Sequence, residues 1–418
     1  MTRHARLFVP FFVCLLLTAQ PRTRNGIVIT GPDSPGMGPF DALMTRMMDR
    51  YGVQGGALAV GKDGRLVLAH GYGMADAERH EPVKPESLFR VASISKPFTS
   101  AAIMKLVEDG KLKLDDRAFD LLSDLKPPAG AKVDPRLRQI TIRDLLLHAG
   151  GWDRDKSFDP MFIPVKAARA VGAPSPASCE TVIRYMLGQP LQFDPGSRSS
   201  YSNFGYCILG RVIEHVSGQR YEDYVRETIL APLGIHRMRS GHSLANRRAP
   251  GEVKYYDFPN APQVASVFGD GEKTPRPYGG FNIEAMDSHG GWIASPIDLV
   301  RFMMGMDGSI PPRVLKPAGI RQILARPALP EFAKTDNWYG FGWSVRPVGR
   351  DANWWHNGSL NGTTTLMVRT SQGMQWAALF NSSPREQDKL FEDLDPGLWD
   401  ACNATKNWPG HDLFGGFR

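Results

Sequence analysis

The stretch "FRVASISKPFTSA", residues 89–101, places Ser93 and Lys96 three positions apart at the start of a predicted helix. Pro97 is tolerated only in the first turn of a helix, so the helix must begin close to Ser93. The apolar side chains after it recur every four residues and predict one buried stripe: Ile94, Phe98, Ala102 and Leu106. Because residues three apart share a helix face, Lys96 is a candidate activator of Ser93.

The Ser-x-x-Lys spacing carries little information by itself. Composition alone predicts about one such pair, and the chain has a second one, Ser123/Lys126, in the proline-bounded loop "LLSDLKPP". Ser93 differs because it lies at a helix N-terminus, where backbone N–H groups favour developing negative charge. A serine needs a base to become a nucleophile, and lysine is a base only when neutral. The hypothesis therefore requires a further titratable group elsewhere in the chain.

The segment "SSYSNFGYC" offers that group. Tyr201-Ser-Asn203 is the only Tyr-x-Asn triplet in the chain, and it directly precedes an amphipathic helix. A tyrosine close to Lys96 would titrate together with it as a coupled pair. Asn203 can both donate and accept hydrogen bonds, which suits the orientation of an ester or amide. The alternative is that Tyr201 packs in the core and Asn203 caps the helix.

A third element lies in "NWWHNGSLNGTTT", where His356-Asn-Gly358 precedes a predicted strand. Glycine at such a point lets the backbone approach a ligand closely. The chain has two other His-x-Gly triplets, one starting at His148 at an apparent helix C-terminus and one at His289 in a Gly-rich bend. The two tryptophans before His356 are candidates for an apolar acyl pocket, with packing in the core as the alternative.

The order of predicted elements is strands, then helices, then strands. Two apolar runs around Lys62-Asp63-Gly64 predict a hairpin, and the segments "YGFGWSV", "TTTLMVRT" and "MQWAALFN" predict antiparallel strands before a last helix over "REQDKLFEDL". The early hairpin cannot bury both of its faces alone. We therefore expect an α+β fold, with one antiparallel sheet built from both chain ends, flanked by helices, and a mainly helical region inserted between them.

The N-terminus resembles a secretory signal. Two arginines precede an apolar run from Leu7 to Leu17, with a small residue at Ala19; an uncleaved anchor is the alternative. We therefore expect a periplasmic or secreted protein. The expected organisation is a signal peptide at 1–19, a linker at 20–39, one folded domain at 40–385, and a C-terminal helix and tail at 386–418. Within the domain, the sheet region covers about 40–88 and 283–385 and the helical region about 89–282, which ends in a polar excursion over 241–282.

Composition excludes some functions. Hydrophobic residues make up 42% and charged residues 22%, as in folded globular proteins. The net charge of +7 comes from scattered lysines and arginines, so no nucleic-acid partner is expected. No cysteine has metal-ligand spacing. Without Cys14 an odd number of cysteines remains, which leaves at least one thiol free, and Cys207 is expected to be a small buried residue.

The three motifs follow one another in the order Ser-x-x-Lys, Tyr-x-Asn, His-x-Gly. In this the chain resembles the serine β-lactamase and D,D-peptidase superfamily, in its class C-like branch, which includes family VIII carboxylesterases. The resemblance extends over roughly residues 40–385 and includes "ITIRDLLLHAGG", "YSNFGYCILGRVIEHVSG", "ILAPLGI" and "GGWIASPIDLVRF". The chain lacks His-Glu-x-x-His, a P-loop and Gly-x-Ser-x-Gly, so metallohydrolase and α/β-hydrolase functions have no support.

The resemblance implies a role for each matching residue and no cofactor or metal. Ser93 would be the acylated nucleophile, and Lys96 and Tyr201 would share the base and acid work. Asn203, His356 and Gly358 would bind substrate, and the backbone N–H groups of Ser93 and Ser359 would form the oxyanion hole. In many relatives the third motif is Lys-Thr-Gly, whose lysine holds a substrate carboxylate, whereas His356 is mostly neutral at pH 7.

We therefore expect an exported serine hydrolase that acts through an acyl-enzyme on short-chain carboxylic esters. The alternatives are a D-amino-acid peptidase or D,D-carboxypeptidase, a class C-like β-lactamase, and a silent module that binds penicillin or peptidoglycan. The expected partner is a small ester or amide substrate. The sequence makes no prediction of the oligomeric state.

Overall fold

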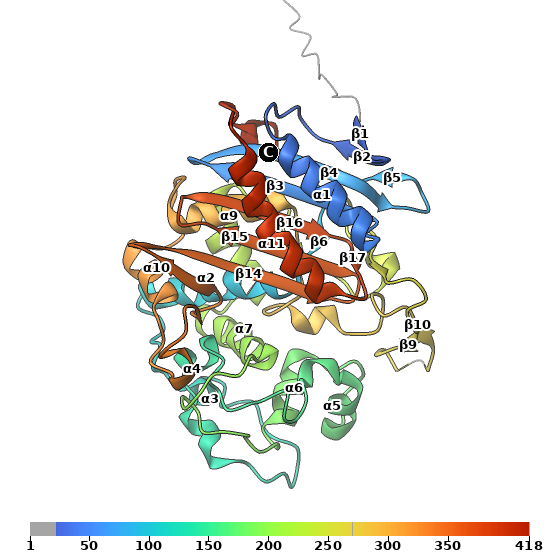
Figure 1. The fold of residues 1–418 in the computed structure, drawn as a ribbon. Helices are drawn as coiled ribbons and strands as arrows, with labels where there is room; N and C mark the ends of the chain where they lie inside the picture. Colours follow the sequence, from blue (N-terminus) through green and yellow to red (C-terminus); the bar gives the residue numbers. More distant parts are fainter. Residues whose placement is uncertain (1–21, 270, 418) are drawn as a thin grey trace, which may run out of the picture.

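The computed structural model describes residues 22–269 and 271–417, and its centre is an antiparallel sheet made from both ends of the chain (Figure 1). The two halves meet where β3 pairs with β16. In spatial order the strands are β1 (Arg22–Arg24), β2 (Ile27–Thr30), β4 (Arg65–Asp76), β3 (Gly55–Lys62), β16 (Met374–Phe380), β15 (Thr363–Arg369), β14 (Asp351–Leu360), β13 (Ser344–Val348) and β12 (Trp338–Tyr339), with β5 (Glu81–Pro82) beside β4. The predicted α+β architecture is confirmed.

The predicted hairpin joins β3 to β4. Lys62 pairs with Arg65, which leaves Asp63 and Gly64 as a two-residue turn. Their φ angles of 54° and 72° are both positive, as the tightest hairpin turns require. The sequence signal and the turn geometry therefore agree.

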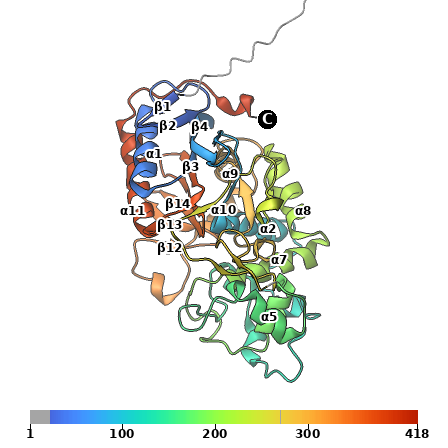
Figure 2. The same ribbon diagram turned by 90° about the vertical axis from the view of Figure 1, so that its right-hand side faces the viewer.

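Helices cover both faces of the sheet. Helices α1 (Gly38–Tyr51) and α11 (Gln387–Ala404) lie side by side on one face, and α9 (Pro296–Asp307) and α2 (Ser95–Glu108) lie beyond the other (Figures 1 and 2). Strand β3 is apolar on both sides for this reason: Leu58 belongs to the cluster under α1 and α11, and Ala59 to the main core.

The inserted region carries most of the remaining helices, which gather at one end of the molecule (Figure 1). They are α3 (Ala118–Leu121), α4 (Ile142–Leu146), α5 (Pro164–Val171), α6 (Cys179–Met186) and α7 (Asn203–Ser217). The last helix of this region, α8 (Tyr221–Val225), packs against α2 and α7, and α10 (Pro317–Leu324) follows later in the chain and contacts α2. The connecting segments contain three small sheets. One is formed by β6 (Phe89–Arg90), β11 (Trp292–Ala294) and β7 (Arg239–Ser240). In the other two, β8 (Tyr256–Asp257) pairs with β17 (Ser382–Ser383), and β9 (Val264–Ala265) pairs with β10 (Lys273–Thr274).

Two expectations at the chain ends need correction. Residues 22–30 lie in the expected linker but form the hairpin β1–β2, and β2 pairs with β4 at the sheet edge. Helix α11 runs ten residues beyond the predicted "REQDKLFEDL" segment, through Pro396, because Leu398 and Ala401 also pack on the sheet. The expected signal peptide at 1–19 lies outside the described residues. Among the described residues, none of the helices combines the length and the apolar character needed to cross a bilayer.

The cysteines differ partly from expectation. Cys207 is buried, as predicted, but it forms a disulfide with Cys179, so α7 is covalently linked to α6. The sequence pattern showed only an apolar helix face and did not identify the partner. Cys402 is the free, buried thiol that the odd count requires.

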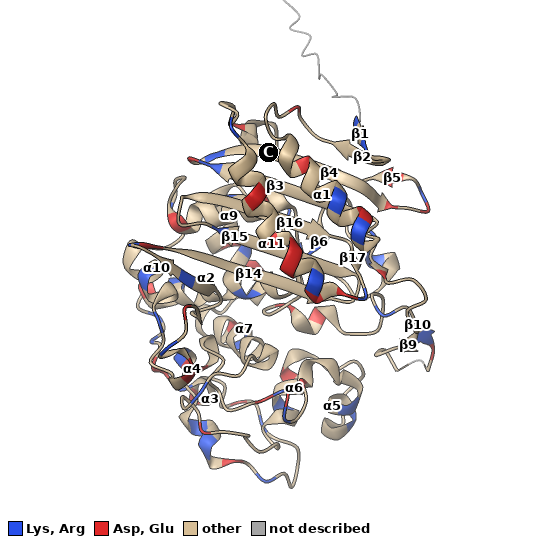
Figure 3. Cartoon of the chain, viewed as in Figure 1, with Lys and Arg blue, Asp and Glu red and all other residues tan. Residues whose placement is uncertain are grey.

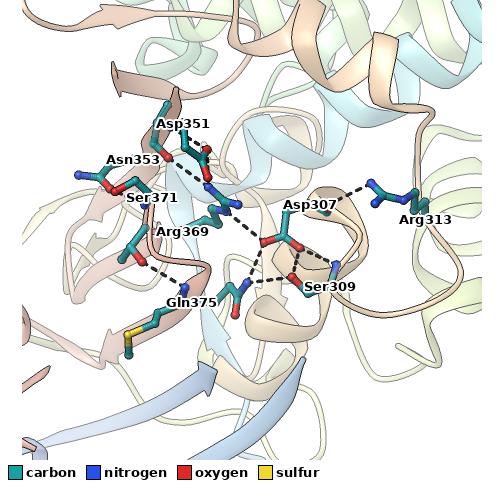
Figure 4. Close-up of polar contacts among 11 residues, drawn as sticks. Asp307, Ser309, Arg313, Asp351, Asn353, Arg369, Ser371 and Gln375 are labelled. Carbon is teal, nitrogen blue, oxygen red and sulfur yellow. Dashed lines mark hydrogen bonds and ion pairs between the residues drawn. The ribbon is translucent and has the colours of Figure 1, made fainter. Parts of the chain in front are cut away.

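Lys and Arg positions alternate with Asp and Glu positions along the described part of the chain (Figure 3). One buried network fastens the end of α9 to the sheet (Figure 4). Asp307 Oδ2 accepts hydrogen bonds from Arg369 Nε at 3.1 Å and from Gln375 Nε2 at 2.8 Å. Arg369 also pairs with Asp351 at 2.8 Å. The network therefore holds β14, β15, β16 and α9 together.

Candidate active site

Ser93 lies in a tightly held turn between β6 and α2. Val91 N donates to Trp292 O at 2.9 Å, and Ser95 Oγ donates to Ala92 O at 2.7 Å. Ala92 has a φ of 47°, a left-handed conformation that few alanines adopt. The turn leads through a short 3-10 helix, Ala92–Ile94, and leaves Ser93 partly exposed at the entrance to α2.

Arg90 connects this turn to the polar excursion over 241–282. Its guanidinium is buried and donates to Pro277 O and His242 O, both at 2.6 Å. The guanidinium carbon of Arg90 also lies 4.3 Å from the centroid of the Tyr255 ring. The excursion is therefore anchored three residues before Ser93.

Lys96 is fully buried beside Ser93. Its Nζ lies 3.1 Å from Ser93 Oγ, 2.7 Å from Asn203 Oδ1 and 3.0 Å from the carbonyl oxygen of His289. Burial holds the pKa of Lys96 well below its usual range, the positive charge of Arg154 lowers it further, and Asp159 acts in the opposite direction. A neutral amine next to a serine hydroxyl is the arrangement that proton removal requires.

Tyr201 faces the same pair. The Tyr201 ring centroid lies 4.7 Å from Lys96 Nζ. Burial raises the pKa of Tyr201, while the nearby Ser93 side chain lowers it. The Tyr201 side chain is therefore part of the site and not only of the core.

Asn203 does not cap its helix, because the cap of α7 is Ser202, whose Oγ accepts from Gly205 N at 3.1 Å. The Asn203 side chain instead bridges Lys96 and Asp159. Its Oδ1 accepts from Lys96, and its Nδ2 donates to Asp159 Oδ2 at 2.7 Å. The amide thus positions Lys96 at the serine.

His356 lies on β14 with both ring nitrogens engaged. Nδ1 donates to Asn357 O at 2.7 Å, which leaves Nε2 to accept from the Tyr339 hydroxyl at 3.0 Å. Burial, and then the charge of Lys96, lowers the pKa of His356 to about 3. The imidazole is therefore neutral and already satisfied by protein groups.

Gly358 brings β14 against the Ser93 turn. A Cβ at this position would lie 2.2 Å from Val91 O, so only glycine permits the approach. The Ser359 side chain points to the other face of the sheet, where its Oγ donates to Gln387 Oε1 at 2.7 Å. The Ser359 side chain therefore does not contribute to the site, and the role of its backbone N–H stays a prediction.

The two tryptophans do not line a pocket beside Ser93. Trp354 is buried in the main core with its ring 4.6 Å from Trp343, and Trp355 packs on the opposite cluster. The core alternative is therefore correct. Ser123 and Lys126 are exposed, and Lys126 Nζ donates only to the Ser123 carbonyl oxygen at 2.6 Å.

Several residues at the site were missed by motif analysis. His148, set aside as a helix terminus, is buried with its ring 4.4 Å from Tyr201 and 4.6 Å from Tyr339. His289, the first residue of the other His-x-Gly triplet, supplies the carbonyl oxygen that Lys96 contacts. Both lie in segments that resemble the superfamily, which is the signal that would have found them. Arg154 and Asp159 lie in an irregular segment and have no such signal.

Comparison with known proteins identifies relatives over most of the chain. Penicillin-binding protein 4 of Amycolatopsis lactamdurans is 31% identical over 370 residues, which is 85% of this chain and 86% of the relative. The D-amino acid amidase of Ochrobactrum anthropi is similar in structure with a TM-score of 0.65 at 23% identity, over 90% of this chain and 100% of the amidase. The hydrolase EstCE1, with promiscuous acyltransferase activity, has a TM-score of 0.66 at 21% identity, over 88% and 99%. At these identities the two structures show the fold.

Residues 40–394 match the family described as Beta-lactamase. This range includes the sheet from β3 onward, the inserted helices and every residue of the site. With the fold of the β-lactamase and transpeptidase type and this match over most of its length, the chain belongs to the β-lactamase family.

Proposed function

We propose that this protein is an exported serine hydrolase that cleaves short-chain carboxylic esters through an acyl-enzyme. The observation that carries the proposal is the contact between Ser93 Oγ and the buried Lys96, whose pKa is lowered, with the Tyr201 ring beside the Lys96 amine. Hydrolases, amidases and penicillin-binding proteins are all relatives of the chain, so the family supports the reaction class and leaves the substrate open.

The proposed reaction has two halves. Ser93 Oγ bonds to the ester carbonyl carbon while its proton passes to the Lys96–Tyr201 pair, and the pair returns a proton to the leaving alcohol as the C–O bond breaks. Water then attacks the acyl carbon in the same way, and the acid leaves as Ser93 regains its proton. The backbone N–H groups of Ser93 and Ser359 would stabilise the oxyanion in both halves.

The substrate preference rests on His356. A β-lactam or a D-Ala-D-Ala peptide carries a carboxylate, and a lysine in the third motif would hold it with a charge-assisted bond, roughly twice as strong as a neutral one. Both ring nitrogens of the neutral His356 are hydrogen-bonded within the protein, so His356 offers the substrate carboxylate neither a charge nor a free donor. A short ester has no carboxylate and loses nothing by this exchange.

Export is supported by the disulfide between Cys179 and Cys207, since such bonds persist in oxidising compartments. The expected leader at 1–19 agrees with it. A D-amino-acid peptidase remains the second candidate because the fold is shared with the Ochrobactrum amidase.

The experiment compares two covalent probes and two substrates. The full-length exported protein is labelled with a fluorophosphonate and with a fluorescent penicillin, and kcat/KM is measured for p-nitrophenyl butyrate and for nitrocefin. We expect fluorophosphonate labelling, ester hydrolysis and slow or negligible nitrocefin hydrolysis. Nitrocefin turnover as fast as that of the ester would replace the esterase proposal by a β-lactamase, and no labelling by either probe would indicate a silent binding module.

A further inference from the structure

The segment 153–160 brings two opposite charges to the site. Asp159 caps the short 3-10 helix Pro160–Phe162, where its Oδ1 accepts from Met161 N at 3.1 Å, and its Oδ2 accepts from Asn203 Nδ2 at 2.7 Å. Arg154 lies five residues earlier, with its guanidinium carbon 5.0 Å from the Tyr201 ring centroid. Both charges thus contact residues that in turn contact Lys96.

Asp159 fixes which way the Asn203 amide points. A carboxylate only accepts hydrogen bonds, so the NH2 end of Asn203 must face Asp159. The carbonyl end then faces Lys96 Nζ at 2.7 Å. Asp159 therefore keeps an acceptor, rather than a competing donor, beside the amine.

Arg154 acts in the opposite sense through its charge. Its side chain is 42% exposed, and the ion pair that the structure gives it is a 3.8 Å contact with Asp155, whose side chain is 88% exposed. Such exposed pairs neutralise little of the charge. A cation beside Lys96 disfavours the ammonium form, and an anion favours it.

We propose that Arg154 and Asp159 are positioning residues that bias the protonation of the Lys96–Tyr201 pair in opposite directions, Asp159 by holding Asn203 and Arg154 by lying against Tyr201. The inference rests on the proposed serine-hydrolase function. In this proposal the segment 153–160 adjusts the pKa of the Lys96–Tyr201 pair, although none of its groups touches the reacting atoms.

The other groups that face Lys96 do not supply a competing charge. Tyr201 and Tyr206 present their rings, with centroids 4.7 Å and 5.7 Å from Lys96 Nζ, and His289 presents its carbonyl oxygen. Burial lowers the pKa of His148, of the His289 ring and of His356, so these imidazoles are neutral. Within residues 22–269 and 271–417, the charges that act on Lys96 are those of Arg154 and Asp159.

The sign of each effect follows directly. The pair must lose a proton to activate Ser93, so kcat/KM falls on the acid side as the pair becomes protonated. Removing the anion at 159 makes that proton easier to lose and moves the acid limb to lower pH. Removing the cation at 154 makes it harder to lose and moves the limb to higher pH. The signs are the same whether Lys96 or Tyr201 releases the proton, because both titrate as one unit.

The test measures the acid limb of kcat/KM for p-nitrophenyl butyrate in Asp159→Asn and Arg154→Gln, using the whole protein. Asparagine has one acceptor oxygen where Asp159 uses two, so Asp159→Asn removes the charge together with one of the hydrogen bonds to Asn203 Nδ2 and Met161 N. Asp155→Asn and Lys156→Gln are matched controls, because both change exposed charges of the same segment. The pH dependence of the fluorophosphonate labelling rate gives a second readout, and circular dichroism confirms folding.

We expect the Asp159→Asn limb to move to lower pH, the Arg154→Gln limb to move to higher pH, and neither control to move. Unshifted limbs, shifts in the same direction, or equal shifts in the controls would overturn the inference and leave the proposed hydrolase intact. An unmodified protein with neither hydrolysis nor labelling would overturn the proposed function, and this inference with it.

Discussion

Tyr339 donates a hydrogen bond of 3.0 Å to His356 Nε2, so the imidazole that replaces the usual lysine of the third motif is held from both sides. Its pKa of about 3 keeps it neutral at any pH at which the enzyme would work. The site therefore lacks a permanent positive charge at the position where many relatives carry one. This is the physical basis for expecting a preference for uncharged esters.

Replacing His356 tests that relationship. His356→Lys should restore a cation on β14 and increase acylation by fluorescent penicillin relative to ester hydrolysis, since a charge-assisted bond to the β-lactam carboxylate becomes available. The measurement is the rate of penicillin labelling divided by kcat/KM for p-nitrophenyl butyrate. Asn357→Lys is the control, because Asn357 is exposed and the next residue of the strand. An unchanged ratio in the first variant would show that the third motif does not select the substrate.

The nucleophile is tested by Ser93→Ala, which should remove turnover and fluorophosphonate labelling, because no neighbour can form the acyl bond in its place. Ser123→Ala is the matched control, since it removes the serine of the other Ser-x-x-Lys pair, which is exposed. Activity is measured with p-nitrophenyl butyrate and labelling by intact mass. Full activity in Ser93→Ala would refute the assignment.

Lys96 is tested by a substitution that keeps its charge. Lys96→Arg should lose nearly as much kcat/KM as Lys96→Ala, because a guanidinium does not become neutral at working pH. Lys105→Arg, on the same helix and paired with Asp109 at 2.5 Å, should keep the activity of the unmodified enzyme. Folding is checked by circular dichroism. If Lys96→Arg retains most of its rate, Lys96 is an electrostatic support and Tyr201 is the base.

Local patterns were enough to predict the parts of the fold that depend on local interactions. The β3–β4 hairpin follows from Asp63-Gly64, and the start of α2 follows from Pro97 and the apolar stripe after it. The same rule would have found β1–β2, because Asn25-Gly26 carries φ angles of 51° and 76° in its turn. The Pro- and Gly-rich composition around it favoured a linker, and pairing with β4 outweighs that composition.

The site was predicted only as far as its motifs reach. Ser93, Lys96, Tyr201 and Asn203 come together as the resemblance implies, although their roles remain to be tested. Asp159 was not found because its contact with Asn203 spans 44 residues and joins an irregular segment to a helix. A single charged residue in a loop has no periodicity or spacing from which tertiary placement follows.

Removing the disulfide should lower the stability of the protein without changing any residue of the site. Cys179 and Cys207 are separated by 28 positions, and a cross-link over such a loop stabilises a protein by about 3 kcal/mol. The double variant Cys179→Ser/Cys207→Ser should have a free energy of unfolding in urea that is lower by about 3 kcal/mol. Adding a reductant to the unmodified protein should lower its free energy of unfolding by the same amount. Cys402→Ser, which removes a free thiol, should respond to reductant like the unmodified protein. Equal stability with and without reductant would mean that the two cysteines are not bonded in the protein.

Replacing Asp307, which lies far from Ser93 in the chain, should lower the stability of the protein and leave its activity unchanged. Asp307→Ala removes the acceptor of both Arg369 and Gln375, and the Asp307 and Arg369 side chains are only 5% and 14% exposed. Breaking a buried pair by removing one partner leaves the other charge poorly compensated, so we expect the free energy of unfolding to fall by about 3–5 kcal/mol. Asp351, which also contacts Arg369, limits the loss toward the lower value. Asp109→Ala, which breaks the half-exposed pair with Lys105, should cost less than about 1 kcal/mol. Both variants should retain kcat/KM per folded molecule; a large fall in kcat/KM for Asp307→Ala at full folding would instead mean that the anchoring of β14 controls the geometry of the His356–Gly358 segment.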